Sequence, residues 1–212
     1  MNSHHCPLCS SAQSKLYHTD STREYYQCLR CDFFFVPSAF HLTDCEEKAR
    51  YDLHQNDQND LNYRQFLSQV SEPLLDRLAK QSTGLDFGCG PGPTLSIMLE
   101  EAGHQVDLYD KFYAQNDEVF SRKYNFIAAT EVVEHLRDPA FELQRLIKML
   151  KPKGVLVLMT EMLNDSSMFA EWYYKNDPSH VGFFNRNSFI EAAKAWQVKL
   201  TIVSERVVIF EC

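Results

Sequence analysis

Residues 85–93 read Leu-Asp-Phe-Gly-Cys-Gly-Pro-Gly-Pro, and the expected fold depends on this run more than on any other. Its apolar start predicts a short buried strand, and the glycines that follow predict a turn. A helix is expected from Thr94 to about Ala102, with Gly103 placed to end it. A strand, a glycine turn and a helix in this order open a doubly wound nucleotide-binding sheet. Glycine suits the turn because it adopts backbone angles closed to other residues and lets the main chain approach a ligand.

The residues of the turn distinguish between two classes of nucleotide cofactor. A dinucleotide site has the pattern G-x-G-x-x-G, but here Gly88 and Gly90 are followed by Pro93 at the third position. Asp86 lies two residues before Gly88, and its carboxylate would repel a pyrophosphate. The same carboxylate would attract the ammonium and sulfonium groups of S-adenosylmethionine. A glycine turn of some other α/β protein is the alternative interpretation.

The segment Asp86-x-Gly88-x-Gly90 resembles motif I of the class I S-adenosylmethionine-dependent methyltransferases. The resemblance implies that the methyl donor is bound at this turn, by Asp86, Phe87, Gly88, Cys89 and Gly90. S-adenosyl-L-methionine is therefore the expected cofactor.

Length and charge limit the classes of protein that the chain can represent. Its 212 residues suffice for one α/β domain and a small module, and no run approaches the ~20 apolar residues that a membrane helix needs. Histidine and cysteine stand near the N-terminus, where a signal peptide has an apolar run, so a cytoplasmic protein without membrane insertion is expected. The net charge of -8 and the lack of a basic stripe disfavour nucleic acid as a partner without excluding it.

Two Cys-x-x-Cys pairs predict a metal site in an N-terminal module of about residues 1–40. The pairs are Cys6 with Cys9 and Cys28 with Cys31, and 18 residues separate them. In a reducing compartment this spacing is typical of zinc, since four thiolates complete a tetrahedral shell. A closed shell leaves no position for substrate, so the zinc would be structural. Disulfides, or a site that has lost its metal, are the alternatives.

Aromatic residues follow the second pair, and the run 33–36 reads Phe-Phe-Phe-Val. We expect this run to pack the module onto the main domain, although it could instead form part of a substrate wall. Residues 41–80 are expected to form a helical connector that closes over the donor, as is common in methyltransferases of this class. Apolar residues recur at helical spacing from Leu61 to Leu78, and Pro73 suggests that two helices meet there.

The connector also carries polar aromatic side chains that could contact the substrate or the methionine part of the donor. The candidates are Tyr51, His54 and Tyr63. Surface helices with solvated side chains are the alternative.

The third segment, residues 81–212, is expected to be the donor-binding domain. A second strand is predicted over 106–109, and Asp110 stands at its end, 22 residues after Gly88. This distance is close to the ~20 residues expected for an acidic residue that accepts hydrogen bonds from ribose hydroxyls. Phe112 or Tyr113 could then lie against the adenine ring. An exposed aspartate at a strand end is the alternative.

The same region departs from the usual pattern of the fold. Only 14 residues separate Asp110 from Asn125, where the next strand starts. A full helix and a third strand would hardly fit into this interval. We therefore expect a shortened edge, with the third strand vestigial or absent.

A second motif follows the strand predicted over 126–129. It reads T-E-V-V-E-H at 130–135, and it faces the crevice of the glycine turn because ligands lie at the carboxyl ends of parallel strands. It resembles the E-V-x-E-H segments of small-molecule methyltransferases. By this resemblance Thr130 and Glu131 lie beside the donor, and Glu134 and His135 border the acceptor. For His135, a hydrogen bond to a neighbouring loop is the alternative.

A long insertion, residues 161–187, is rich in aromatic side chains. Long loops in compact domains are often functional, and Trp172 and Tyr173 are candidates for the acceptor pocket. His180 is the candidate general base, because the ordinary pKa of histidine lies near working pH. A histidine that only fixes the loop by hydrogen bonds is the alternative.

The remaining pattern completes the sheet. Asp138 and Pro139 predict the start of a helix that runs to about residue 150, and residues 151–154 predict a turn. A helix capped by Asn187 follows, and then two antiparallel strands at 199–204 and 207–211.

Together these features resemble the zinc-ribbon-bearing branch of the class I methyltransferases, which is related to ubiquinone-type and sugar C-methyltransferases. The expected fold is α/β: a Rossmann-like sheet with an antiparallel last strand and a shortened third-strand edge, preceded by a zinc ribbon and lid helices. The resemblance implies in-line transfer of a methyl group to an oxygen, nitrogen or carbon nucleophile of a small molecule. Methylation of RNA or protein guided by the ribbon, and a catalytically silent adaptor, are the alternatives.

Overall fold

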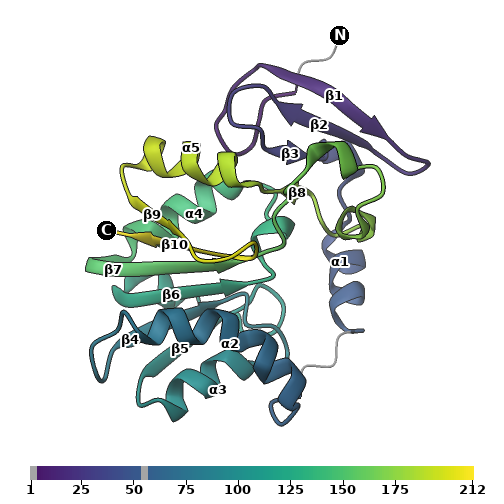
Figure 1. Ribbon diagram of the computed structural model, residues 1–212. Helices are drawn as coiled ribbons and strands as arrows, with labels where there is room; N and C mark the ends of the chain where they lie inside the picture. Colours follow the sequence, from purple (N-terminus) through teal and green to yellow (C-terminus); the bar gives the residue numbers. More distant parts are fainter. Residues whose placement is uncertain (1–3, 54–56) are drawn as a thin grey trace.

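The computed structural model describes residues 4–53 and 57–212, which form two sheets and the helices around them (Figure 1). The larger sheet contains β4 (Thr83–Phe87), β5 (Gln105–Tyr109), β6 (Tyr124–Thr130), β7 (Leu150–Met159), β9 (Lys199–Ile202) and β10 (Val207–Glu211). The smaller sheet contains β1 (Ser14–Thr19), β2 (Glu24–Cys28), β3 (Phe34–Phe35) and β8 (Gly182–Phe183).

The α-helices are α1 (Asp44–Tyr51), α2 (Leu61–Leu75), α3 (Thr94–Glu101), α4 (Pro139–Lys148) and α5 (Arg186–Trp196). Short 3₁₀ helices occur at η1 (Ser38–Phe40), η2 (Asp117–Ser121), η3 (Val133–His135), η4 (Ser166–Met168) and η5 (Tyr173–Asn176). Within the described ranges, no helix combines the length and apolarity needed to cross a bilayer.

The larger sheet has the strand order β5-β4-β6-β7-β10-β9. β4 runs parallel to β5 and β6, and β6 runs parallel to β7, whereas β10 runs antiparallel to both β7 and β9. The expected α/β fold with an antiparallel last strand is confirmed. Parallel strands covered on both faces require unbroken apolar runs, and residues 126–129 of β6 form such a run, fully buried.

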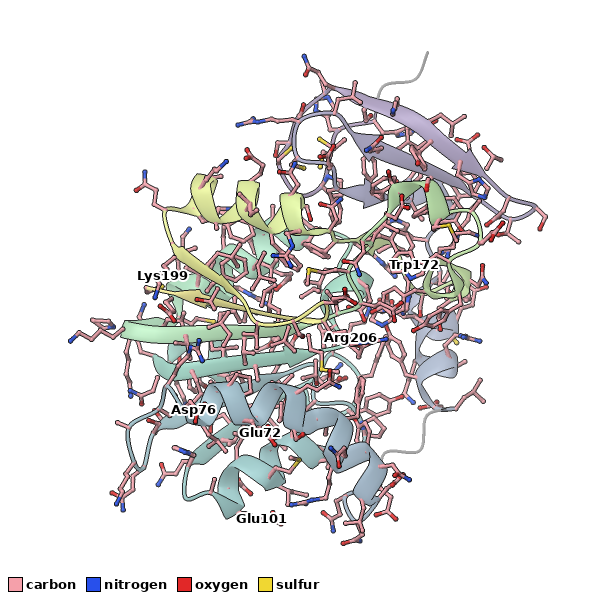
Figure 2. The ribbon with its side chains drawn as sticks, viewed as in Figure 1. Glu72, Asp76, Glu101, Trp172, Lys199 and Arg206 are labelled. Carbon is pink, nitrogen blue, oxygen red and sulfur yellow. The ribbon has the colours of Figure 1, made fainter. Side chains whose placement is uncertain are left out.

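Helices cover both faces of this sheet (Figure 1). Phe126 and Ala128 of β6 belong to the apolar cluster that includes the buried side chains of α2 and α3. Ile127 and Ala129 belong to the cluster that includes those of α4 and α5. Successive side chains of a strand point to opposite faces, so β6 supplies both layers of the core. Figure 2 shows polar side chains on the outer surface of α2 and α3, with Glu72, Asp76 and Glu101 labelled.

The edge of the sheet at β5 is short, as expected. Between Asp110 and Tyr124 the chain makes an isolated bridge from Asp110 to Ala114 and then η2, and β5 stays an edge strand. A crossover to a further parallel strand needs a dozen or more residues before that strand begins. The 13 residues of this interval cannot supply both.

The smaller sheet joins the N-terminal module to the insertion. Its strand order is β1-β2-β3-β8, and β3 pairs with β8 through Phe34 with Phe183 and Phe35 with Gly182. A Cβ atom at Gly182 would lie 2.7 Å from the ring of Phe33, so glycine is required for this close approach. The expected packing of the aromatic run onto the main domain is confirmed, because the ring of Phe33 also contacts Phe184.

Three local predictions differ from the structure. α2 is one helix that contains Pro73, where two helices were expected. Proline normally ends a helix, but Pro73 stands two residues before the end of α2, and Leu74 beyond it is fully buried in the core. The packing of Leu74 therefore keeps the last turn in place.

The other two differences concern α5 and β7. α5 begins at Arg186 and is capped by Asn185 instead of Asn187, because Asn185 and Ser188 bond reciprocally to each other's backbone N–H. The turn expected at 151–154 is part of β7, where Lys153 adopts a positive φ of 64° and the register with β6 shifts. A bulge therefore absorbs these residues within the strand.

Candidate functional site

A cavity of about 1180 Å³ opens at the carboxyl ends of β4, β5 and β6, where ligands bind in open α/β sheets. α1, α2 and the insertion complete its walls. The predicted site residues that line it are Tyr51, Tyr63, Phe87, Gly88, Cys89, Gly90, Asp110, Phe112, Thr130, Glu131, His135, Tyr173 and His180. Among the described residues predicted for the site, Asp86, Glu134 and Trp172 are outside the cavity surface. His54 lies outside the described residues.

The glycine turn forms one wall of the cavity with its main chain. Gly88 and Gly90 have positive φ angles of 78° and 64°, which other residues rarely adopt. A Cβ atom at Gly88 would lie 2.4 Å from a methyl carbon of Val132, so the position also excludes any side chain. The N–H of Gly88 donates to the carbonyl of Tyr109 at 2.7 Å, and the N–H of Gly90 donates to Asp110 at 3.0 Å.

Asp110 connects this turn to the end of β5. Its Oδ2 accepts from Gly90, and its Oδ1 accepts from the N–H groups of Phe112 at 2.7 Å and Tyr113 at 3.0 Å. A carboxylate has about four acceptor positions, so one position on Oδ2 is left for a ligand. Asp110 therefore shapes the turn in addition to any contact with ribose.

Asp86 lies beneath the turn instead of at the cavity surface. Its side chain is buried and accepts a hydrogen bond from Ser96 Oγ at 2.7 Å. Burial raises the pKa of Asp86 to about 6, with a smaller contribution from the negative charge of Asp110. Direct contact between Asp86 and the donor stays a prediction.

A buried hydroxyl joins the two glutamates of the second motif. Tyr174 Oη donates to Glu134 Oε1 at 2.5 Å and lies 3.2 Å from Glu131 Oε2. Burial raises the pKa of Glu134 to about 8, and the neighbouring charge of Glu131 adds to the shift. Glu134 therefore lies under the cavity and is connected to the cavity lining by its hydrogen bond with Tyr174. The aromatic run of the insertion pointed to this region, but sequence reasoning singled out its neighbours and missed Tyr174.

Those neighbours occupy different places. Tyr173 lines the cavity, and its hydroxyl bonds to Glu161 and, at 3.2 Å, to Arg206. Trp172 donates from Nε1 to Glu161 at 2.8 Å, and its ring packs in the aromatic cluster of the insertion. Arg206 lies in the turn before β10 and faces Glu131 at 3.7 Å (Figure 2). Sequence reasoning missed Arg206, which no motif marks.

The two histidines lie side by side in the cavity lining, with ring centroids 4.7 Å apart. His180 Nδ1 is 2.7 Å from the carbonyl oxygen of Tyr174, and His135 Nδ1 is 3.1 Å from that of Ser179. A carbonyl oxygen only accepts, so each Nδ1 carries the hydrogen, and the Nε2 of a neutral ring is an acceptor. Burial lowers the pKa of His180, which keeps its ring neutral near pH 7.

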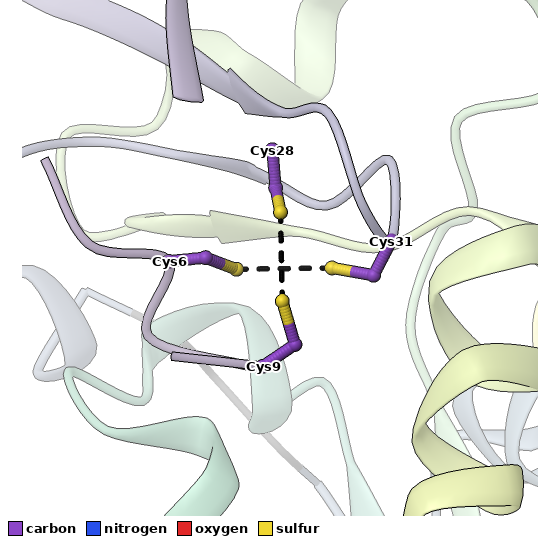
Figure 3. A group of neighbouring side chains, drawn as sticks. All are labelled: Cys6, Cys9, Cys28 and Cys31. Atoms are coloured by element: carbon purple, nitrogen blue, oxygen red, sulfur yellow. Dashed lines mark hydrogen bonds between the residues drawn. The ribbon is translucent and has the colours of Figure 1, made fainter. Parts of the chain in front are cut away.

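Two groups of side chains in the described ranges have the spacing of metal ligands. Glu134, His135 and His180 each have one ligand atom within 4.8 Å of the others. Hydrogen bonds hold both Glu134 and His180 to Tyr174, so the closeness of these two groups needs no ion. The other group consists of the four cysteines of the N-terminal module, with Sγ–Sγ distances of 3.7 Å for Cys6 to Cys31 and 3.5 Å for Cys9 to Cys28 (Figure 3).

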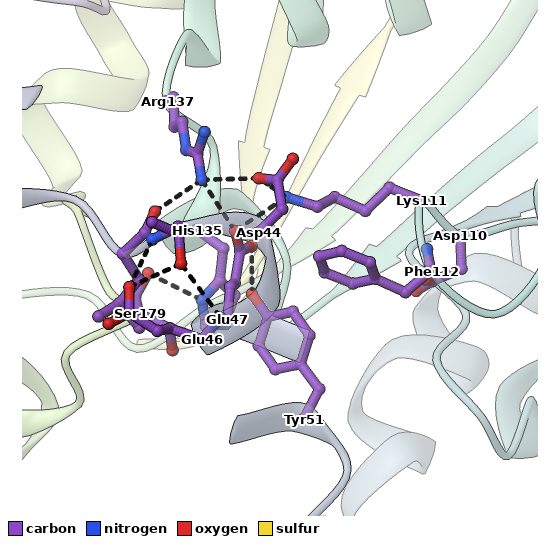
Figure 4. Close-up of polar contacts among 12 residues, drawn as sticks. Asp44, Glu46, Glu47, Tyr51, Asp110, Lys111, Phe112, His135, Arg137 and Ser179 are labelled. Atoms are coloured by element: carbon purple, nitrogen blue, oxygen red, sulfur yellow. Dashed lines mark hydrogen bonds and ion pairs between the residues drawn. The ribbon is translucent and has the colours of Figure 1, made fainter. Parts of the chain in front are cut away.

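α1 lies over the cavity, and ion pairs connect this helix to other segments around the cavity (Figure 4). The buried carboxylate of Glu47 accepts from Lys111 Nζ at 2.8 Å and from Arg137 at 3.3 Å. On the same helix, Arg50 donates to Asp177 of the insertion at 2.7 Å. These side chains come from four distant segments. No local sequence pattern therefore indicates this network of ion pairs, and sequence reasoning missed it.

Tyr51 occupies the inner face of α1. Its hydroxyl donates to Glu47 at 2.8 Å, and its ring centroid lies 5.2 Å from that of His135 and 5.9 Å from that of Phe112. Tyr51 therefore stands between the side chains predicted for the adenine and for the acceptor. Tyr63 lines the cavity from α2.

The chain matches a family model described as a methyltransferase domain over residues 59–203, which is more than half of its length. This range contains the glycine turn, Asp110, His135 and His180. The four cysteines lie outside it.

Curated relatives are ubiquinone biosynthesis O-methyltransferases. The protein from Klebsiella pneumoniae is 24% identical over 145 residues, which cover 64% of this chain and 59% of that protein. The protein from Citrobacter koseri is 27% identical over 143 residues, which cover 63% of this chain and 58% of that protein. The chain thus matches less than two thirds of the length of these relatives.

Two solved structures share the fold at low sequence identity. The 1,6-didemethyltoxoflavin-N1-methyltransferase of Burkholderia thailandensis, with bound 1,6-didemethyltoxoflavin and S-adenosylhomocysteine, has a TM-score of 0.52 at 14% identity and covers 93% of this chain and 97% of its own. The magnesium protoporphyrin IX methyltransferase of Synechocystis PCC 6803, with bound S-adenosylhomocysteine, has a TM-score of 0.51 at 14% identity and covers 79% and 93%. Because the family model spans most of the large sheet and the fold agrees, this chain belongs to the methyltransferase domain family.

Proposed function

We propose that the chain is an active methyltransferase that takes a methyl group from S-adenosyl-L-methionine and passes it to a small molecule. The glycine turn carries the proposal: Gly88 and Gly90 have positive φ angles, and their N–H groups bond to Tyr109 and Asp110 at the carboxyl edge of the sheet. The relatives are named as O-methyltransferases, and one structure of this fold is an N1-methyltransferase. These names support an oxygen or nitrogen as the accepting atom, and a carbon nucleophile is the third candidate.

The donor would lie along the glycine turn and the end of β6. The acceptor position left on Asp110 Oδ2 suits a ribose hydroxyl, and Phe112 lines the cavity where adenine would follow. Thr130 and Glu131 also line the cavity, and the carboxyl group of Glu131 would then lie near the cationic part of the donor. Buried Asp86 adds a second carboxyl group beneath the turn.

The acceptor would lie between the donor and the two histidines. Bound S-adenosyl-L-methionine would supply a methyl group on a positively charged sulfur. The nucleophile would attack the methyl carbon in line and displace the sulfur. Alignment of the reacting atoms is worth up to ~7–11 kcal/mol in well-oriented systems. We assign His180 as the general base for a nucleophile that arrives protonated, because its Nε2 is an acceptor and its ring is neutral near pH 7. His135 borders the same space. Glu134 lies beneath this space and bonds to Tyr174, which lines it.

The size of the cavity supports a small acceptor. Its volume of about 1180 Å³ exceeds the ~300–1,000 Å³ of a typical ligand pocket, so a donor and a small acceptor fit together. The net charge of -8 argues against a nucleic-acid substrate, whose phosphates bind to basic surfaces.

We further propose that Cys6, Cys9, Cys28 and Cys31 hold a structural zinc ion in a module of about residues 1–40. The Sγ–Sγ distances of 3.5 and 3.7 Å are close to the ~3.8 Å that Zn–S bonds of ~2.3 Å give in a tetrahedron. Sulfurs in a disulfide would be ~2.05 Å apart. Four thiolates close the shell, so the zinc would stabilise the module and take no part in methyl transfer.

A labelling experiment tests the proposed reaction. S-adenosylmethionine with a labelled methyl group is incubated with the protein and a cell extract, which is then separated into small-molecule, protein and RNA fractions. We expect label in the small-molecule fraction with the native chain and with Glu191→Gln, a surface control on α5, and much less with His180→Gln. Label in the RNA or protein fraction would contradict a small acceptor. Donor binding without label in any fraction would favour the adaptor.

A further inference from the structure

One arginine of the N-terminal module binds residues 175–180 of the insertion on the side opposite the cavity. Arg23 directly precedes β2, stands 157 residues before His180 in sequence, and is only 5% exposed. Residues 175–180 lie beside it in space, and they comprise the end of η5 and part of the irregular segment that leads to β8. Backbone carbonyls in such a buried segment need partners that a sheet or helix would otherwise supply.

The guanidinium of Arg23 donates all five of its N–H groups. Nε donates to the hydroxyl of Tyr25 at 2.8 Å. The two terminal nitrogens donate to four backbone carbonyl oxygens, those of Lys175, Asp177 (2.7 Å), Pro178 (3.1 Å) and His180 (3.0 Å). The planar fork of a guanidinium fixes the positions of its acceptors relative to one another, which a flexible ammonium does not. Arg23 therefore sets the path of the segment instead of only contacting it.

Arg23 is itself held rigidly. Its backbone N–H donates to Asp20 Oδ1 at 3.0 Å, and Tyr25 donates its hydroxyl to Asp20 Oδ2 at 2.7 Å. A buried charge is costly unless hydrogen bonds compensate it. The five acceptors of the guanidinium provide that compensation, so the arrangement is specific to arginine.

The opposite side of the same segment faces the cavity. His180 bonds through Nδ1 to the carbonyl of Tyr174, and the carbonyl of Ser179 accepts from His135 at 3.1 Å. Asp177 accepts from Arg50 of α1 at 2.7 Å. The backbone that Arg23 fixes therefore contributes four residues to the cavity lining: Asn176, Asp177, Ser179 and His180.

We propose that Arg23 is a positioning residue for the acceptor side of the cavity: it fixes the backbone of residues 175–180 so that His180 faces the space beside the glycine turn. The importance of His180 rests on the proposed function, but the positioning by Arg23 does not depend on any reaction. The N-terminal module thereby supplies part of the active-site architecture without reaching into the cavity.

Hydrogen exchange measured by mass spectrometry on residues 172–184 tests the positioning directly. In Arg23→Ala, four carbonyls lose a charged donor, and we expect exchange in this segment to rise roughly tenfold or more, with little change along β4 to β6. Arg23→Lys should be intermediate, because its single nitrogen cannot reach all four carbonyls. The control Arg122→Ala removes an exposed arginine that pairs with Asp107 and should leave the segment unchanged.

Chemical rescue separates positioning from a general loss of packing. Millimolar guanidinium should restore slow exchange and methyl transfer to Arg23→Ala, whereas urea, a planar molecule without the charge, should not. The affinity of Arg23→Ala for S-adenosylhomocysteine should equal that of the native chain, because the glycine turn is untouched.

Native exchange rates in folded Arg23→Ala would overturn the proposal. If that variant does not fold, native rates in Arg23→Lys would overturn it equally. A native chain that fails to bind S-adenosylhomocysteine would contradict the proposed function, while the exchange result would still decide the role of Arg23.

Discussion

The two walls of the cavity are built in different ways. The wall that we propose for the donor is mostly main chain from two segments close in sequence: the N–H groups of Gly88 and Gly90 bond to the carbonyl of Tyr109 and the side chain of Asp110, within 22 residues of Gly88. The acceptor wall is made of side chains from α1, η3 and the insertion, with Arg23 of the N-terminal module behind it. A wall made of local backbone depends on a few residues of special conformation, whereas an assembled wall depends on long-range contacts.

This difference implies that the two walls can be disturbed separately. Changes on the proposed acceptor side should spare donor affinity, and changes at the glycine turn should weaken donor binding without loosening the insertion. The four predictions that follow test this separation, starting from the largest expected effect.

Cys28→Ser should have the largest effect. Structural zinc contributes an apparent ~10–16 kcal/mol in zinc-finger peptides, so we expect loss of the metal, unfolding of the N-terminal module and faster exchange in β8, which pairs with β3. Affinity for S-adenosylhomocysteine should stay close to that of the native chain. Metal analysis, thermal unfolding and calorimetry provide the measurements. Cys45→Ser, at an exposed thiol outside the cluster, is the control. Retention of zinc by Cys28→Ser would contradict the proposed site.

His180→Gln should reduce methyl transfer by a factor of ~10²–10⁴, the usual contribution of a general base, while donor affinity stays unchanged. The base must be neutral to accept a proton, so the rate of the native chain should fall only as the pH drops below the pKa of His180. Burial lowers that pKa from its ordinary value near ~6.5, so the acidic limb should lie below this pH. Steady-state rates against pH measure both effects. Loss of donor binding in His180→Gln would show that the assigned role is wrong.

Gly88→Ala should weaken donor binding by about 1–3 kcal/mol, because a φ of 78° is strained for alanine and its Cβ would overlap Val132. Calorimetry with S-adenosylhomocysteine measures the loss. Gly103→Ala is a matched control, since Gly103 has a φ of 91°, its Cβ would meet nothing within 4 Å, and it lies outside the cavity lining. The double variant Gly88→Ala/Val132→Ala should recover only the part that is due to overlap. Native affinity in Gly88→Ala would contradict a donor site at this turn.

Asp86→Asn should have an effect no larger than that of Gly88→Ala, and its sign is the test. The folded state raises the pKa of Asp86 from 3.8 to about 6, so the ionised carboxylate destabilises the fold above about pH 6 and this cost disappears as the pH falls below 3.8. The amide oxygen of the variant can still accept from Ser96, so we expect about 1–3 kcal/mol greater stability than the native chain at pH 7.5 and no advantage at low pH. Urea unfolding at both pH values measures it. Lower stability at pH 7.5 would indicate that the carboxylate has an unseen cationic partner.

The donor side could be predicted from the sequence because its determinants are local. A run of apolar residues, two glycines and an aspartate 22 residues later specify strand, turn and strand end. The short edge beside β5 followed from chain length alone. The position of Asp86 could not be read in this way, since sequence spacing does not reveal that Ser96 covers its carboxylate.

The acceptor side was predicted only in part. His135, His180 and Tyr173 were named from a motif and an aromatic loop, and they do line the cavity. Their supports, Arg23 and Tyr174, were not found, because each acts through contacts that only the folded chain creates. The pairing of β3 with β8, which joins the N-terminal module to the insertion, could not be predicted either. Two strands of two residues each are too short to leave a periodic signal.

Calorimetric titration with S-adenosylhomocysteine, with NAD as a control, tests the central claim most directly. Binding of S-adenosylhomocysteine in the micromolar range, no binding of NAD, and an equal affinity in His180→Gln would agree with a donor wall that is independent of the acceptor wall. Binding of neither ligand, or of NAD alone, would contradict the claim that the glycine turn holds S-adenosylmethionine.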